Sequence, residues 1–182
     1  MSRVLVPLAQ GCEELEAITI TDLLVRAGID VVTAGLDAGP VVASRGATIL
    51  PQTTLDQLAD ETFDMIVLPG GLPGADHLRD HAGLQAMLKR HAEQGKTLAA
   101  ICAAPKALEK AGLLDGKTAT SYPGVLEALN NPAITISTAA IEQDGNIVTS
   151  RGPGTAMDFA LTLIERLQGH ATRHQVEQAL VR

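Results

Sequence analysis

The sequence has no tryptophan, and aromatic residues make up only 2% of its 182 positions. A core built around large aromatic side chains is therefore excluded. Apolar residues still account for 46% of the chain, so Val, Ile, Leu and Ala must fill the interior. This length and composition predict one domain, spanning residues 1–182.

Cysteine is also scarce, with Cys12 and Cys102 as the only two. Two cysteines cannot build a disulfide framework, and we expect both to be free thiols. No apolar run approaches the roughly 20 residues that span a bilayer, and the segment Met1–Pro7 lacks the pattern of a signal peptide. The sequence therefore predicts a cytoplasmic protein with no membrane partner.

Acidic residues outnumber basic ones: the chain has 21 Asp and Glu but only 14 Lys and Arg, so its net charge is -7. An acidic surface repels phosphate backbones, so we expect no extended nucleic-acid surface. The segment Gly152–Gly154 lacks the third glycine or alanine of a dinucleotide fingerprint. The histidine pairs four residues apart lack a third metal ligand. We expect neither a cofactor nor a metal.

Short apolar runs of strand character alternate with longer segments of helical periodicity. This alternation predicts an α/β fold with a mostly parallel sheet and helices on both faces. A hairpin is expected around Asp144–Gly145. The main expected strands are Arg3–Leu8, Ile29–Ala34, Phe63–Leu68 and Thr97–Ile101, with a short pair at Val41–Ser44 and Ala47–Leu50; the expected helices are Glu13–Ala27, Thr54–Ala59, Leu84–Glu93, Ala103–Ala111, Thr155–Leu167 and Arg173–Val181.

Ligands of parallel α/β sheets bind beyond the carboxyl ends of the strands. Four segments are expected at that edge: Leu8–Gly11, Pro69–Gly71, Ile101–Ala103 and Ser150–Gly154. These segments are where the sequence predicts chemistry.

Cys102 stands where a strand is expected to end and a helix to begin, with Pro105 suited to the first helical turn. This arrangement is typical of a nucleophile elbow with Cys in place of Ser. Amide groups and the dipole at a helix N-terminus lower a thiol pKa, so we expect a reactive thiolate. The same pattern is also compatible with a small, inert, buried side chain.

Two glycines follow the neighbouring strand and expose backbone N–H groups without side chains in the way. We expect Gly70 and Gly71 to lie near the sulfur. Paired N–H groups from Gly71 and Ala103 are the candidate oxyanion hole. The alternative is a plain tight turn after a strand.

Glu16 is the candidate acid. It shares a helix row with Ile20, Leu23 and Leu24, and that otherwise apolar row should face the sheet. A buried carboxyl stays protonated or finds a partner, and a raised pKa suits a proton shuttle. Acids at neighbouring positions in the first turn are explained by the helix dipole alone.

Taken together, these residues resemble the ThiJ/PfpI superfamily, in the branch of the Parkinson-disease-associated protein deglycase and bacterial YajL. Five segments that span nearly the whole chain in one order carry the resemblance: Gly11–Glu16, Ser44–Gly46, Val67–Gly71, Ala99–Pro105 and Thr149–Thr155.

The resemblance implies a flavodoxin-like three-layer sandwich, a homodimer, and an oxidisable Cys102 hydrogen-bonded to a protonated Glu16. It places Arg45 and Arg26 near the dimer interface. It also implies cofactor-free chemistry on methylglyoxal, glyoxal or their early adducts with proteins and nucleotides. A redox-controlled chaperone or oxidative-stress sensor with little catalysis is the alternative that it leaves open.

Two positions depart from the family's patterns. Peptidase-type members have His directly after the cysteine, and this chain has Ala103 there, so we do not expect a peptidase. A pocket His of the human-type branch is replaced by Tyr122, whose phenol pKa near ~10 makes it a poor base at neutral pH. General base duty then falls on Glu16 or water.

Overall fold

A seven-stranded sheet runs through the computed structural model, which describes residues 1–182. Its strand order is β10-β11-β7-β6-β1-β2-β5, and all neighbouring pairs are parallel except the β10–β11 hairpin. Buried on both faces, the central strands have continuous apolar sequences. The strands are β1 (Arg3–Leu8), β2 (Asp30–Gly35), β5 (Thr53–Thr54), β6 (Met65–Leu68), β7 (Thr97–Ile101), β10 (Ile141–Asp144) and β11 (Ile147–Ser150).

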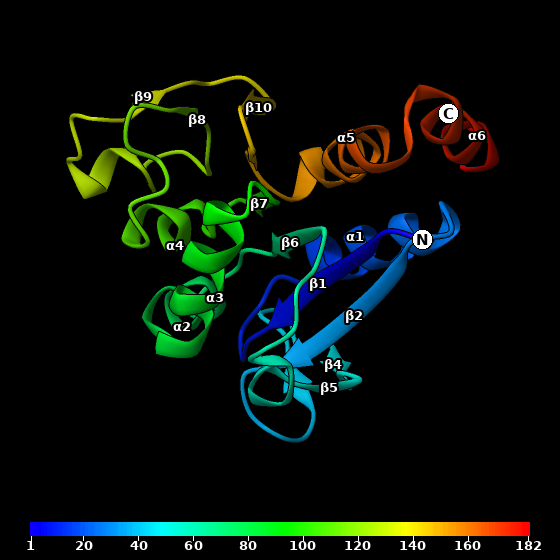
Figure 1. Ribbon diagram of the computed structural model, residues 1–182, viewed down its shortest axis with the longest axis horizontal. Coiled ribbons are helices and arrows are strands. Elements are labelled where there is room, and N and C mark those ends of the chain that lie inside the picture. The colour runs from blue at the N-terminus through cyan, green and yellow to red at the C-terminus, as the bar shows by residue number, and fades with distance from the viewer.

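Helices cover both faces of this sheet, as Figure 1 shows. One layer packs against one face through apolar side chains such as Ile20 and Phe159, and the other layer packs through residues such as Leu84 and Leu108. The predicted three-layer α/β sandwich is confirmed. The first layer comprises α1 (Glu14–Arg26), α5 (Ala156–Gln168) and α6 (His170–Ala179), and the second comprises α2 (Gly74–Asp80), α3 (Ala82–Glu93) and α4 (Pro105–Lys110).

Small elements decorate the rim of the sandwich. The strands β3 (Val41–Val42) and β4 (Thr48–Ile49) form the expected short antiparallel pair. A separate two-stranded parallel sheet joins β8 (Thr118–Ala119) to β9 (Thr135–Ile136). Single 3-10 turns occur at Leu55–Leu58, Glu127–Leu129 and Pro153–Thr155.

Several predicted boundaries were wrong. In place of the helix expected over Thr54–Ala59, the structure has a 3-10 turn over Leu55–Leu58, and the Thr54 side chain makes no capping hydrogen bond. The helix expected from Ala103 begins at Pro105, because the two alanines remain in the turn after β7. Helix α2 was not predicted at all. Helix α6 begins before Arg173, at His170, directly after a positive-φ glycine that separates it from α5.

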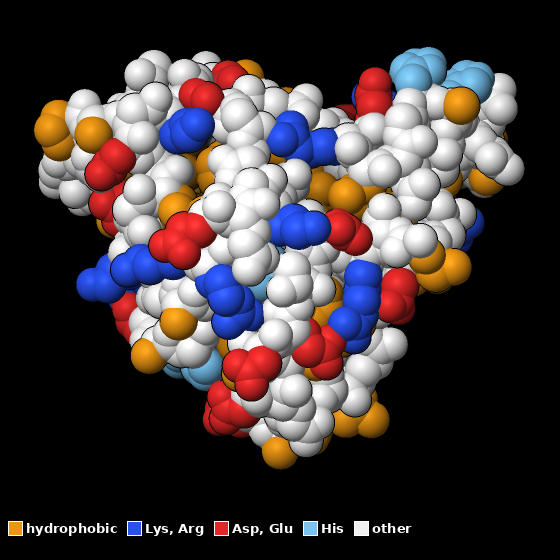
Figure 2. Space-filling model, viewed as in Figure 1, with side chains coloured by type: hydrophobic (Ala, Val, Ile, Leu, Met, Phe, Trp, Pro, Cys, Tyr) orange, Lys and Arg blue, Asp and Glu red, His pale blue; other side chains and the backbone are white.

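None of the helices has both the length and the sustained apolar character needed to cross a membrane. On the face shown in Figure 2, acidic and basic side chains are interspersed, and no continuous basic area appears there.

His91 anchors α3 to the loop before β6. The side chain is fully buried; its Nδ1 lies 2.8 Å from the Met87 carbonyl, and its Nε2 accepts from the Phe63 N–H at 3.0 Å. Both bonds require the neutral ring. Burial accordingly lowers the pKa of His91 below its ordinary value of 6.5.

His91 should therefore make stability depend on pH. Its contribution is fully present above 6.5, the ordinary value of the unfolded chain, and declines as the pH falls below it, because the unfolded chain takes up the proton more readily. Replacing His91 by Leu leaves the Phe63 N–H unpaired and should cost about 1–3 kcal/mol at pH 7.5.

Urea unfolding at pH 7.5 and pH 5.5 checks this prediction. The difference in unfolding free energy between wild type and His91→Leu should shrink at the lower pH. The exposed residue His170 supplies a control, since His170→Leu should show no such trend. A wild-type to His91→Leu difference that stays constant with pH would contradict the assignment.

Candidate active site

Cys102 sits at the carboxyl end of β7 in a conformation that few residues adopt. Its φ is +64°, in the left-handed region, which costs a non-glycine residue about 1–3 kcal/mol. Two backbone hydrogen bonds hold it there: its N–H donates to Ser150 O, and its carbonyl accepts from Tyr122 N–H, both at 2.9 Å. The elbow expected from the sequence is present, and two segments distant in sequence fix its geometry.

The sulfur is almost enclosed. Cys102 is 8% exposed and lines none of the three principal cavities of the chain. The N–H groups of Gly71 and Ala103 act as hydrogen-bond donors to it and favour its ionised form. The structure thus brings the predicted donors together at the sulfur itself.

Glu16 is fully buried on α1, on the row predicted to face the sheet. Its Oε2 accepts from the Gly70 N–H at 2.7 Å. Its Oε1 is buried without a hydrogen-bond partner, and the carboxyl lies within hydrogen-bonding reach of the Cys102 thiol. Burial raises the pKa of Glu16 to about 7.

The pKa of Cys102 runs against the sequence prediction. Burial is the largest cause, and the charge and hydrogen bond of an ionised Glu16 add to it, so the pKa rises to about 12. The Gly71 and Ala103 amides only partly oppose this rise. Helix α4 is six residues long and starts three positions after the sulfur, so its dipole gives little help.

Gly70 is the point where the acid and the thiol meet. A Cβ atom built on Gly70 would lie 2.6 Å from Cys102 Cβ and 2.8 Å from Glu16 Oε2. Any side chain there would force the two groups apart. Gly71 has a φ of +88°, and a Cβ on it would lie 2.4 Å from the Glu13 backbone nitrogen. The strand-end glycines are therefore needed for close approach.

The start of α1 is fixed from two sides. Glu13 caps the helix, because its carboxylate accepts from the Glu16 N–H at 2.8 Å. The Glu14 carboxylate accepts from the Arg45 N–H at 2.9 Å and from the Ser44 hydroxyl at 3.2 Å, which lowers its pKa and ties the β3–β4 hairpin to the helix. The helix dipole alone therefore does not explain Glu14.

The side chains of the other predicted residues lie outside this hydrogen-bonded group. Arg26 is exposed and pairs with Asp22 at 2.8 Å, and the exposed Arg45 contributes its backbone rather than its guanidinium. Tyr122 reaches Cys102 through its backbone, while its side chain is 52% exposed. Cys12 is buried, and burial with the nearby Glu14 charge raises its pKa to about 11.

Sequence reasoning missed Ser150 as a support of the elbow. It pairs with Ile101 in the β11–β7 register, which places its carbonyl opposite the Cys102 N–H. The segment that begins at Ser150 was expected at the functional edge of the sheet, but the register of two strands distant in sequence was not readable from the residues.

The chain is similar to known proteins over most of its length. Residues 2–166 match the DJ-1/PfpI family. Protein dj-1beta of Drosophila melanogaster is 44% identical over 178 residues, covering 97% of this chain and 95% of that protein. A Caenorhabditis elegans relative named glutathione-independent glyoxalase DJR-1.2 is 34% identical over 160 residues, covering 88% of this chain and 85% of that protein.

The solved structure of oxidized Toxoplasma gondii DJ-1 superimposes with a TM-score of 0.95 at 42% identity and covers 100% of this chain and 98% of that one. The sequence and structure comparisons therefore agree that the chain belongs to the DJ-1/PfpI family.

Proposed function

We propose that this chain is a cofactor-independent cysteine enzyme that acts on methylglyoxal, glyoxal or their early adducts, as a glyoxalase-like enzyme or deglycase. The observation that carries the proposal is the contact between the Cys102 thiol and a buried carboxyl, Glu16, whose pKa is raised to about 7. A group that titrates near neutral pH is suited to moving protons during turnover. The C. elegans relative named as a glyoxalase supports this reaction class.

The reaction starts when the sulfur adds to the aldehyde carbon and forms a hemithioacetal. Glu16 then takes the proton from that carbon while the neighbouring carbonyl oxygen is protonated, which gives an enediol. A proton is returned to the neighbouring carbon, the hydroxyl on the first carbon loses its proton, and a thioester results. Water cleaves the thioester to lactate and regenerates the thiol, so the net reaction adds one water and needs no external oxidant. Glyoxal gives glycolate by the same steps.

Backbone amides stabilise the charge that develops. The Gly71 and Ala103 N–H groups that donate to the sulfur are available to the substrate oxygen once the sulfur has reacted. The Tyr122 side chain is half exposed and takes the place of a pocket imidazole, so Glu16 carries the proton transfers.

Restricted access favours small substrates. With Cys102 8% exposed, a two- or three-carbon aldehyde fits the approach better than a peptide in extended conformation. Ala103 at the position of the peptidase histidine supports the same conclusion. We propose that residues 1–182 form one ThiJ/PfpI-like domain that works in the cytoplasm.

A redox role is the second candidate. In it, hydrogen peroxide oxidises the Cys102 thiolate to a sulfenic acid and then to a sulfinic acid, and is itself reduced to water. The amides of Gly71 and Ala103 and a protonated Glu16 would hold the added oxygens. The oxidized state named for the T. gondii relative favours this candidate, whose cellular role would be that of a chaperone or oxidative-stress sensor.

We also propose a homodimer. Leu15, Ile18 and Val25 are 50%, 49% and 59% exposed and lie on one row of α1. Val42, in the hairpin that Glu14 ties to the start of that helix, is also 50% exposed. An apolar row continuing onto a docked hairpin is suited to contact a second copy of the chain.

Lactate production from methylglyoxal tests the proposed enzyme. Cys102→Ser should abolish turnover because the nucleophile is lost, and Glu16→Gln should lower it about 10²-fold or more because the proton shuttle is lost. Cys12→Ala and Asp22→Asn serve as matched controls that keep turnover.

Turnover that survives Cys102→Ser would contradict the proposal. Absence of wild-type turnover would also contradict it, and peroxide-dependent suppression of client aggregation would then support the redox candidate.

Analytical ultracentrifugation tests the dimer. Wild type should sediment with twice the mass of one chain, and Ile18→Glu should sediment as a monomer because it buries a charge in the apolar contact. Val181→Glu, at a 94% exposed position near the C-terminus, is the control that should stay dimeric. A monomeric wild type, or a dimer unaffected by Ile18→Glu, would overturn this assignment.

A further inference from the structure

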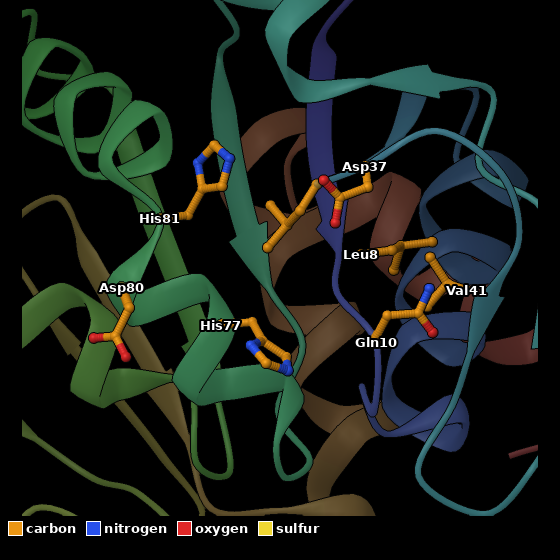
Figure 3. Close-up of a pocket in the computed structure, with 8 residues that line it drawn as sticks. Leu8, Gln10, Asp37, Val41, His77, Asp80 and His81 are labelled. Atoms are coloured by element: carbon orange, nitrogen blue, oxygen red, sulfur yellow. The ribbon is translucent and has the colours of Figure 1, made fainter.

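A cavity separate from the Cys102 site lies at the carboxyl ends of β1 and β2, beside α2. Its volume is about 340 Å³, and it shares no lining residue with the Cys102 site. Figure 3 shows side chains from both strand ends and from the end of α2 around one space. The lining residues are Leu8, Gln10, Leu36, Asp37, Val41, His77, Asp80 and His81.

The cavity has a fixed frame. The Gln10 amide donates to Pro40 O at 3.0 Å, and its Oε1 accepts from the Val42 N–H at 2.9 Å, which fastens the loop after β2 to the end of β1. On the opposite side, His81 Nδ1 accepts from the Leu84 N–H at 3.1 Å. Its neutral ring therefore carries its proton on Nε2.

The two carboxylates that line the cavity differ in whether they have a partner within the chain. Both Asp80 oxygens are bonded to Arg79, at 2.7 Å and 2.8 Å, and in Figure 3 this carboxylate points away from the space. Asp37 is exposed, and its carboxylate has no hydrogen-bond or ion-pair partner within the chain. Neither ring nitrogen of His77 is hydrogen-bonded. The His77 imidazole and the unpaired Asp37 carboxylate therefore remain available to a ligand.

We propose that this cavity binds a small organic cation, namely a primary ammonium group on a short aliphatic chain. The Asp37 carboxylate would pair with the ammonium, and His77 would accept a hydrogen bond from it or from a neighbouring donor. Leu8, Leu36 and Val41 would contact the hydrocarbon. The volume lies at the lower end of the range for ligand pockets, which limits the ligand to a short chain.

The arrangement favours an ammonium over a bare metal ion. No three His, Cys, Asp or Glu side chains of the chain are arranged to hold a metal. An anion is disfavoured because the unpaired charge of the lining is negative. A ligand pocket at the strand ends of an α/β sheet is in the position where such folds bind small molecules.

Titration followed by ¹H–¹⁵N NMR tests the site, with n-butylammonium, n-butanol and butyrate as probes of equal chain length. Butylammonium should give saturable shifts at the amides of Leu36, Asp37, Val41 and His77. Asp37→Asn should weaken this binding about fivefold, the upper end of the loss expected of one exposed ion pair. Asp60→Asn, an exposed acid outside the cavity, is the matched control that should bind as wild type.

Cys102→Ser should also bind butylammonium as wild type, which keeps this test independent of the proposed enzyme activity. Equal binding of butanol or butyrate would overturn the proposal. So would unchanged binding in Asp37→Asn, or shifts scattered over acidic surface positions instead of gathered at the cavity.

Discussion

A carboxyl and a thiol are buried side by side in this protein, and their surroundings accommodate one negative charge but not two. Burial is the largest cause that raises the pKa of Cys102 to about 12, and ionised Glu16 adds to the rise by its charge and by accepting the thiol proton in a hydrogen bond. When Glu16 is protonated, its charge is lost and the carboxyl becomes a hydrogen-bond donor, which favours the thiolate. A thiolate therefore exists only while Glu16 holds the proton, and the pair behaves as one acid that first titrates near 7.

The fold is organised to keep that pair together. The left-handed conformation of Cys102 is maintained by Ser150 and Tyr122, which come from β11 and from the loop after β8. Glu16 enters from the opposite layer on α1, whose start is capped by Glu13. Gly70 stands between them and contributes an N–H to the carboxyl. The pair thus depends on long-range packing more than on any single motif.

Much of this arrangement was predictable from local patterns. A cysteine between a strand and a proline-led helix indicated the elbow, and a lone carboxylate in an apolar helix row indicated a buried acid. The parallel sheet followed from the alternation of strands and helices. These predictions hold because strand alternation and helix periodicity act over a few residues and are written directly in the sequence.

The predictions that were wrong or missing concern contacts between distant segments of the chain. The direction of the Cys102 pKa shift is set by burial and by Glu16. The expectation of a lowered pKa considered only the helix N-terminus that follows the cysteine. The role of Glu14 at the hairpin and of Ser150 at the elbow depends on registers that bring remote residues together. Helix α2 is short and begins beside Gly11 and Cys12, against which Gly74 packs closely, so its sequence carries only a weak periodic signal.

The pH dependence of Cys102 alkylation by iodoacetamide, in a Cys12→Ala background, tests the shared proton most directly. We expect the wild-type rate to rise through a midpoint near 7, where the pair loses its first proton. In Glu16→Gln the thiol titrates alone, and the midpoint should move to its ordinary value of 9.0 or above. A wild-type midpoint at or above 9.0 that Glu16→Gln leaves unchanged would contradict the coupling between the two groups.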